Sequence, residues 1–149
     1  MRAVVQRVTR ASVAVEGETV GRIDCGLLVF LGVEVGDEKV DLDYLVGKIT
    51  GLRIFEDAER KMNRSLLDTQ GSLLVISQFT LLGNVKKGKR PSFVRAAKPA
   101  LARRLYQEFI ESCRLLSVPV QTGIFQAEMA VELVNDGPVT ILLDSRKQF

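Results

Sequence analysis

The stretch Gly26–Val33 reads GLLVFLGV and is a continuous apolar run of strand length. Such a run is typical of a central strand that is buried on both faces of its sheet. Before it, Met1–Thr9 alternates loosely between apolar and polar residues, which indicates a strand. Ser12–Glu16 and Thr19–Asp24 flank Gly17 and indicate a hairpin. The sequence therefore predicts that the chain begins with a sheet.

Two helices are expected. The first opens at Gly36–Asp37, because apolar residues then recur at the i, i+3, i+4, i+7 spacing of a buried helix face. These residues are Leu42, Leu45, Val46, Ile49 and Leu52. The second runs from about Phe93 to Leu116, and Pro99 in its early part indicates a kink or a later start. Its inner stripe comprises Leu101, Leu105, Phe109, Cys113 and Leu116.

The remaining apolar segments have the length of strands. They are Arg53–Phe55, Ser65–Leu67, Ser72–Phe79, Val118–Thr122, Met129–Val134 and Val139–Asp144. Polar or glycine-rich connections separate them at Glu56–Asn63, Gly83–Pro91 and Asn135–Pro138, the last of which reads as a tight turn. Roughly eight strands and two helices predict an α+β fold, with a mainly antiparallel sheet and the helices packed outside it. We expect one domain over residues 1–149.

The composition is ordinary for a globular protein that works in water. Apolar residues make up 46% and charged residues 26% of the chain, and the longest apolar stretches are strand-sized. Polar Gln6 and Thr9 interrupt the segment where a signal peptide would need its apolar run. We therefore expect a cytoplasmic protein. A formal net charge of +3 permits an anionic partner without requiring one.

The chain contains no histidine. This excludes Ser-His-Asp and Cys-His catalysis and any histidine-based metal site. Cys25 and Cys113 are far apart and lack the spacing of metal ligands, so we interpret them as a buried pair of free thiols. No glycine-rich phosphate loop lies between a strand and a helix. We expect neither a metal nor another cofactor, and an enzyme here would work without the usual neutral-pH base.

Ser77–Leu81, which reads SQFTL, is the first candidate site segment. It follows a strongly apolar strand, so it lies where a buried strand reaches the surface. The side chains of Ser77, Gln78 and Thr80, together with backbone N–H groups, can hold a carbonyl oxygen as negative charge develops on it. On composition alone, a polar strand end that leads into a loop is the more frequent explanation.

Asn135–Thr140, which reads NDGPVT, is the second candidate segment. Asn-Asp-Gly is strong turn chemistry and proline fixes the exit, so the plain interpretation is a hairpin turn. Proline is nevertheless a poor start for a strand that must donate hydrogen bonds. A cis Gly137–Pro138 bond would turn the backbone sharply and expose its carbonyls, although trans is the commoner form of such bonds.

A basic stretch follows the first segment closely. It reads Lys86-Lys87-Gly88-Lys89-Arg90, and Arg95, Arg103 and Arg104 come after it. A flexible cationic loop suits a phosphate backbone, and a solvated charged loop is an equally good interpretation. Aromatic residues are few, so stacking on nucleic-acid bases would rest on one or two rings, with Phe125 as a candidate.

Three further stretches accompany the two motifs. They are Val5–Val8 (VQRV), Arg90–Phe93 (RPSF) and Thr122–Phe125 (TGIF). In this combination the chain resembles the D-aminoacyl-tRNA deacylases of the bacterial and eukaryotic type. The resemblance extends from Met1 to about Leu143, and SQFTL together with NxGPVT at this separation is specific. One departure is Gln126, where we expect a smaller residue, and this bears on the shape of an adenosine pocket.

The resemblance implies the barrel-like fold of that family. It also implies hydrolysis of the ester that joins a D-amino acid, or mischarged glycine, to the 3′ end of tRNA. The enzyme would be a homodimer with active sites at the interface, without a cofactor or a membrane. Ser77, Gln78 and Thr80 would be the catalytic residues. The substrate-binding residues would be Phe79, Phe125, Gly137, Pro138, Asn135 and Arg7, and the tRNA-binding residues Lys86, Lys87, Lys89 and Arg90.

Several details stay open at this point. Thr80 is either a nucleophile or only positions the ester, while the 2′-hydroxyl of the substrate assists. The resemblance implies a cis Gly137–Pro138 bond that enters the partner subunit's pocket, holds the amino group and leaves no room for an L side chain. Arg7 would hold the NDGP turn through charge-assisted hydrogen bonds, or be an exposed strand arginine. A non-catalytic RNA-binding dimer module and a purely structural dimer domain are the alternative functions.

Overall fold

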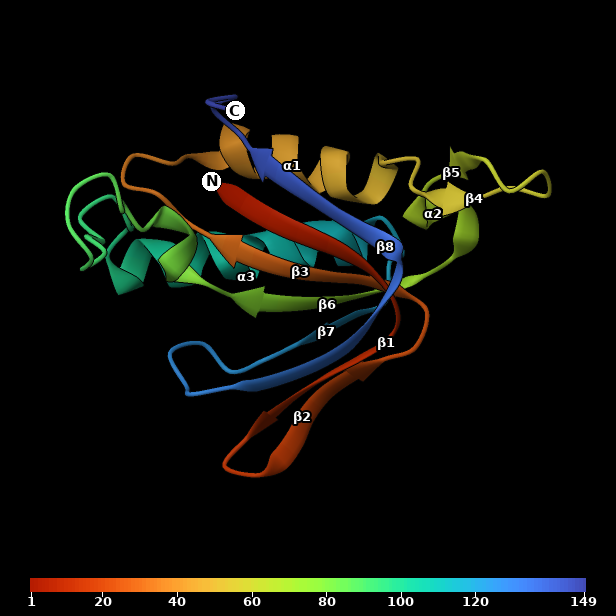
Figure 1. Ribbon diagram of the computed structural model, residues 1–149, viewed down its shortest axis with the longest axis horizontal. Coiled ribbons are helices and arrows are strands. Elements are labelled where there is room, and N and C mark those ends of the chain that lie inside the picture. Colours follow the sequence, from red (N-terminus) through yellow and green to blue (C-terminus); the bar gives the residue numbers. More distant parts are fainter.

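The apolar run that starts at Gly26 lies at the centre of the sheet. The computed structural model describes residues 1–149. β3 (Gly26–Gly32) pairs antiparallel with β1 (Arg2–Val15) and parallel with β6 (Ser72–Ser77) (Figure 1). The strand order is β2-β1-β3-β6-β7, and β8 pairs along the opposite edge of β1. The central position of β3 is the one that its composition predicts.

The other elements surround this centre. In chain order they are β2 (Glu18–Ile23), α1 (Lys39–Gly51), β4 (Phe55–Glu56), β5 (Met62–Arg64), α2 (Leu66–Thr69), the 3₁₀ turn η1 (Phe79–Leu82), α3 (Pro99–Leu115), β7 (Val120–Thr122) and β8 (Ala130–Asp144). β4 and β5 form a separate two-stranded sheet. No helix combines the length and the apolar character that crossing a membrane requires.

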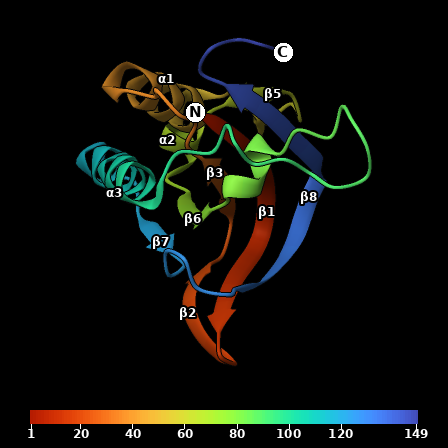
Figure 2. The ribbon, with the colours of Figure 1, turned by 90° about the vertical axis from the view of Figure 1, so that its left-hand side faces the viewer.

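β1 organises the sheet because three strands pair with it. Its first half pairs with β3 and its second half with β2, while β8 follows it from Arg2 to Ala14. Irregularities in the ladders with β2 and β8 increase the local twist. The β1–β8 ribbon curls away from the central strands (Figure 2), and β2 comes close to β7. The sheet is therefore mixed, nearly closed and barrel-like, which confirms the predicted fold class.

The hydrophobic core has two parts. Helices α1 and α3 lie on one side of the sheet (Figure 2) and cover the larger cluster, which includes Val29, Leu45 and Phe109. The smaller cluster fills the curled half of the sheet and includes Val13 and Leu74. α1 lies in the connection from β3 to β6, and α3 lies in the connection from β6 to β7. Such crossovers join parallel strands, which explains the parallel pairs within a mainly antiparallel sheet.

Several element boundaries differ from the prediction. Ser65–Leu67 is not a strand, because the Ser65 hydroxyl accepts a hydrogen bond from the Asp68 N–H at 3.2 Å and caps α2, a third helix. The long helix α3 begins at Pro99 rather than near Phe93, which is the later start that Pro99 indicated, since proline fits the first helical position. Leu116 lies beyond this helix and is exposed.

Two further expectations fail. The strand expected from Arg53 begins only at Phe55. The cysteines are both free, but Cys25 is exposed and only Cys113 is buried. Arg53 and Cys25 lie between elements, where the pattern of apolar residues gives little information about structure and burial.

The expected hairpin near the C-terminal end is also wrong. Met129–Val134 and Val139–Asp144 do not pair with each other but belong largely to the single strand β8. β1 is long enough to pair with both halves, so the chain continues in one direction instead of reversing. Asn135–Pro138 is consequently an interruption within a strand. Its turn-forming residues change the direction of the backbone locally and do not reverse the chain.

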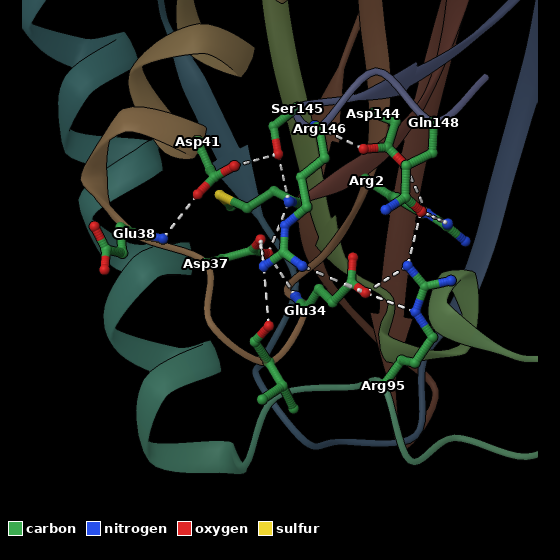
Figure 3. Close-up of polar contacts among 12 residues, drawn as sticks. Arg2, Glu34, Asp37, Glu38, Asp41, Arg95, Asp144, Ser145, Arg146 and Gln148 are labelled. Atoms are coloured by element: carbon green, nitrogen blue, oxygen red, sulfur yellow. Dashed lines mark hydrogen bonds and ion pairs between the residues drawn. The ribbon is translucent and has the colours of Figure 1, made fainter.

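A network of charges around the buried Asp37 ties Met1 and the segment after β8 to the loop that leads into α1 (Figure 3). The Met1 ammonium lies 2.7 Å from Asp37 Oδ2, and it donates to Ser145 Oγ at 2.6 Å. Arg146 Nη2 lies 3.0 Å from the other oxygen of Asp37. Charges that are removed from water are costly unless they are paired. The pairs therefore fix how these three segments sit together.

Candidate active site

A pocket of about 620 Å³ opens beyond the ends of β3 and β6. Its lining is mostly apolar, and its polar side chains are those of Ser77, Gln78 and Gln126. No acidic or basic side chain is among the lining residues. A concave, mainly apolar pocket with a few polar groups is typical of a site that binds a small organic group.

The charge network of Figure 3 supports one wall of this pocket. The carbonyl of Val33 accepts a hydrogen bond from the Ala97 N–H at 2.9 Å, and both residues line the pocket. Glu34, which follows Val33, is buried and forms an ion pair with Arg95, which precedes Ala97 by two residues. Arg95 Nε donates to the Glu34 carboxylate at 2.6 Å (Figure 3). The segment that precedes α3 is thereby fixed against the end of β3.

The SQFT segment supplies the polar end of the pocket. β6 ends at Ser77, and the Gln78 N–H donates to the carbonyl of Leu31 at 2.8 Å, which fixes the start of η1. Ser77, Gln78 and Phe79 line the pocket, whereas Thr80 does not. The Thr80 hydroxyl instead accepts a hydrogen bond from the Gln78 side-chain amide. Hydroxyl and amide donors at this end can hold a carbonyl oxygen on which charge develops.

Aromatic side chains complete the lining. Phe79 and Phe93 are in edge-to-face contact with their ring centroids 5.1 Å apart, and the ring of Phe125 lies 5.8 Å from that of Tyr106. The Tyr106 hydroxyl donates to the carbonyl of Val75 at 2.8 Å, and burial raises the pKa of Tyr106 to about 12. Tyr106 thus stays protonated and backs the Phe125 ring from inside the fold.

Asn135–Thr140 interrupts the β1–β8 ladder. Four residues of β8 in this segment stand opposite the single residue Arg7 of β1. The Asn135 side chain closes the segment, because its Oδ1 accepts from the Val139 N–H at 2.9 Å and its Nδ2 donates to the Val139 carbonyl at 3.1 Å. The Gly137–Pro138 peptide bond is cis, and both of its residues are exposed.

Arg7 is buried beside this segment and is not an exposed strand arginine. Its Nε lies 3.1 Å from Asp136 Oδ2 as an ion pair, although the angle does not make a hydrogen bond. Its Nη1 donates to the carbonyl of Ile54 at 2.6 Å. Arg7 therefore contacts the NDGP segment through the Asp136 carboxylate, and the carbonyl that it binds belongs to another part of the chain.

One chain brings together only part of the predicted site. Of the predicted site residues, four line the pocket described above: Ser77, Gln78, Phe79 and Phe125. Arg7 and the whole of Asn135–Thr140 lie outside its lining. The basic residues Lys86, Lys87, Lys89 and Arg90 are exposed on a loop that projects beyond the sheet (Figure 1). Backbone hydrogen bonds between Asn84 and Ser92, of 2.8 and 3.0 Å, close the base of this loop.

Sequence reasoning missed two aromatic residues of the site. Phe93 ends the RPSF stretch, so a signal for it was present, although it was not assigned to the pocket. Tyr106 lies next to Leu105 of the predicted helix stripe, and only the packing of α3 against β6 shows its contact with Phe125.

Comparison with known proteins finds relatives over nearly the whole chain. The family model described as D-Tyr-tRNA(Tyr) deacylase matches residues 4–144. A D-aminoacyl-tRNA deacylase of Desulfitobacterium hafniense (strain DSM 10664 / DCB-2) is 60% identical over 149 residues, which are 100% of both chains. A second relative with that description, from Thermosipho africanus (strain TCF52B), is 57% identical and is also covered completely.

A solved structure is also similar over nearly the whole chain. It is described as a c-Myc DNA unwinding element binding protein, with a TM-score of 0.91 and 43% identity over 97% of this chain and 98% of that one. Since the family model spans nearly all of the sequence and relatives match it from end to end, this chain belongs to the D-Tyr-tRNA(Tyr) deacylase family.

Proposed function

We propose that this protein hydrolyses the ester that joins a D-amino acid to the 3′-terminal adenosine of tRNA. The observation that carries the proposal is the pocket beyond β3 and β6. Its lining combines the hydrogen-bond donors of Ser77 and Gln78 with the aromatic ring of Phe125. An aminoacyl ester is already activated. Orientation and one oxyanion donor, the latter worth about 10²–10³-fold, supply much of the required rate without histidine.

The ester lies at the SQFT end in this proposal. Ser77 and Gln78 face the scissile carbonyl, and the adenine packs against Phe125 with Phe79 bordering the ribose. Thr80 lies outside the lining and is hydrogen-bonded to Gln78, which supports a positioning role rather than attack on the ester. The 2′-hydroxyl of the substrate, which neighbours the ester on the ribose, assists the reaction.

Chiral selection requires a second element. L and D amino acids contain the same atoms, so an apolar pocket alone distinguishes them poorly. We assign selection to the carbonyl groups and the ring of Gly137–Pro138 from a second copy of the chain, because this segment does not line the pocket of its own chain. Its exposure on β8 and its support by Asn135 and Arg7 favour this assignment.

A row of apolar side chains supports the homodimer. Leu142 of β8 pairs in register with Val4 of β1, and Val4 pairs with Phe30 of β3. Residues that are directly opposite each other share one face of a sheet. Leu142 is 60% exposed, and Val4 and Phe30 are only partly buried, so this face is incompletely covered within one chain. A second copy seated here would extend the contact around the Gly137–Pro138 segment of the same strand.

Two further features follow from this arrangement. Glycine is also a substrate, because a site that excludes only the L side chain does not reject an amino acid without one. The loop with Lys86, Lys87, Lys89 and Arg90 contacts tRNA phosphates, since its charges are exposed and free of ion pairs. We place the reaction in the cytoplasm, where aminoacyl-tRNA is consumed.

The direct test is incubation of the protein with matched D- and L-aminoacyl-tRNA and measurement of the released amino acid. We expect rapid release from the D form and from glycyl-tRNA, and no release from the L form above the uncatalysed rate. Binding of tRNA without release of amino acid would support the non-catalytic RNA-binding module instead.

The shared site is tested by mixing two defective chains. Gln78→Ala impairs the pocket, and Gly137→Ala displaces the segment that enters it, so each variant alone should hydrolyse D-aminoacyl-tRNA more slowly. A mixed dimer combines both defects in one site and leaves the other site intact, so random mixing should restore roughly a quarter of the sites. Each variant refolded alone is the control. A mixture with no more activity than the two variants measured separately would place the complete site within one chain.

A further inference from the structure

Arg103 of α3 contacts two residues that line the pocket. Its guanidinium carbon is 4.8 Å from the centroid of the Phe125 ring. Its Nη2 donates to Gln126 Oε1 at 3.1 Å. Phe125 and Gln126 both line the pocket, and Arg103 is exposed. The ring attracts the cation and the amide fixes its direction, so the guanidinium is held beside two residues of the pocket lining.

The charge of Arg103 is not compensated. The neighbouring Arg104 pairs with Glu108 at 3.2 Å, on the same helix. Arg103 has no carboxylate partner, and its hydrogen-bond acceptor Gln126 is a neutral amide that occupies a single N–H group. Arginine carries several N–H donors in one plane. Most of these donors and the full positive charge are therefore available to an anion beside the pocket.

We propose that Arg103 binds the backbone phosphate of the terminal adenosine of tRNA, while Phe125 and Gln126 hold its guanidinium in place. This inference rests on the proposed packing of adenine against Phe125. Base and 5′-phosphate are joined to the same ribose, so a cation that borders the base-binding residue can reach the phosphate. The planar guanidinium suits bidentate contacts with phosphate oxygens. Gln126, which departs from the expected small residue, then serves as the anchor of this arginine.

The test compares a substrate that carries the phosphate with one that lacks it. The first is D-aminoacyl-tRNA, and the second is the D-aminoacyl ester of adenosine. We expect Arg103→Gln to raise KM for the tRNA substrate several-fold with unchanged kcat, and to leave KM for the adenosine ester unchanged. The slope of log KM against log salt concentration should become shallower by about 0.7, because one phosphate contact is lost. Arg103→Lys, which retains the charge, should recover part of the lost affinity.

Arg104→Gln is the matched control, because it removes the same charge one residue away and Arg104 is already paired. An unchanged KM of Arg103→Gln for the tRNA substrate would overturn the proposal, as would an equal effect of Arg104→Gln. An equal rise of KM for both substrates would also overturn it and would leave Arg103 only a support of the Phe125 ring. Phe125→Leu tests the underlying assumption separately: if it changes KM for neither substrate, the proposed position of adenine fails.

Discussion

The residues that line the pocket are uncharged, and this determines its chemical character. Its lining has no acidic or basic side chain, and Tyr106 behind it stays protonated with a pKa of about 12. No side chain of this lining therefore changes its charge near neutral pH. Chemistry in this pocket depends on placement of donors and on groups that the substrate brings, which is consistent with a chain without histidine.

The pH dependence of the rate tests this view. In the range of about pH 6–9, we expect any inflection in kcat to come from the ammonium group of the substrate. It should disappear when a D-α-hydroxyacyl-tRNA, which has no amino group, replaces D-aminoacyl-tRNA. An inflection that persists with the hydroxyacyl substrate would reveal a titrating group of the protein.

Thr80 permits a second prediction at this scale. A hydroxyl without an adjacent base is a weak nucleophile, and the partner of the Thr80 hydroxyl is the Gln78 amide. Thr80→Ala should therefore retain hydrolysis and lose less than about 10²-fold in kcat, the cost of one oxyanion donor. Single-turnover release from D-aminoacyl-tRNA measures this, with Thr80→Ser as the control. Complete loss of kcat with unchanged binding would favour the covalent role.

The sequence predicted part of the pocket at the level of residues. Ser77, Gln78 and Phe79 are contiguous, so their placement followed from the end of one strand. Phe125 was a candidate because the chain has few aromatic rings, the family resemblance supported it, and it lies in the same pocket. Arg103 was named only as one of the cations that follow the basic loop, and its place beside the pocket could not be predicted, because its contacts with Phe125 and Gln126 depend on how α3 packs against a loop that is distant in sequence. The catalytic and binding roles of these residues remain predictions.

At the scale of elements, β8 shows why local patterns can mislead. Asn, Gly and Pro in Asn135–Pro138 predicted a hairpin, since these residues are common in tight turns. The same residues also allow a strand to bulge and continue when a long partner strand is available. β1 is such a partner. Its length could not be seen in the sequence, because Met1–Thr9 and Ser12–Glu16 were predicted as separate strands and are joined in the structure.

Gly137 is the position in β8 at which substitution should have the clearest effect. Its φ of +124° is a conformation that L residues rarely adopt, and an added Cβ would lie 2.8 Å from Val139 Cγ2 and 3.0 Å from Arg7 Nη2. Gly137→Ala should displace the segment and raise hydrolysis of L-aminoacyl-tRNA relative to the D form. Gly47→Ala is the control, because a Cβ there meets no atom within 4 Å. An unchanged ratio of D to L rates would remove Gly137 from chiral selection.

Helix α1 carries a prediction about acid stability. Burial raises the pKa of Asp41, but hydrogen bonds from the Ser145 hydroxyl and the Glu38 N–H outweigh this effect, and the pKa lies below its ordinary 3.8. A lowered pKa in the folded state stabilises the fold above 3.8, and this contribution is lost as the pH falls through the folded value.

Asp41→Asn should therefore lower the free energy of unfolding at neutral pH by about 1 kcal/mol, the usual worth of a helix cap. The difference from the parent protein should shrink in acid. Urea unfolding at neutral pH and below the ordinary pKa measures both effects. Asp43→Asn on the exposed face of α1 is the control, because Asp43 pairs only with Lys39. An equal loss of stability at both pH values would contradict the assignment.

For the whole molecule, the fold class and the central place of β3 followed from the sequence. The apolar run of β3 and the helical spacing in α1 and α3 are strong local signals. The parallel pairs β3–β6 and β6–β7 and the closure of β2 toward β7 could not be predicted in this way, because they depend on crossovers and on the curl of β1. Local periodicity does not contain this information.

The pairing of β1 with β8 also dictates when the fold can be completed during translation. β1 leaves the ribosome long before β8 does, so the edge of β1 from Arg2 to Ala14 waits unpaired while the intervening residues are made. An open strand edge invites association with other chains, and pairing over such a separation is slow. Nascent chains stalled before β8 emerges should therefore be sensitive to protease and bound by chaperones, and those stalled after its emergence should be resistant.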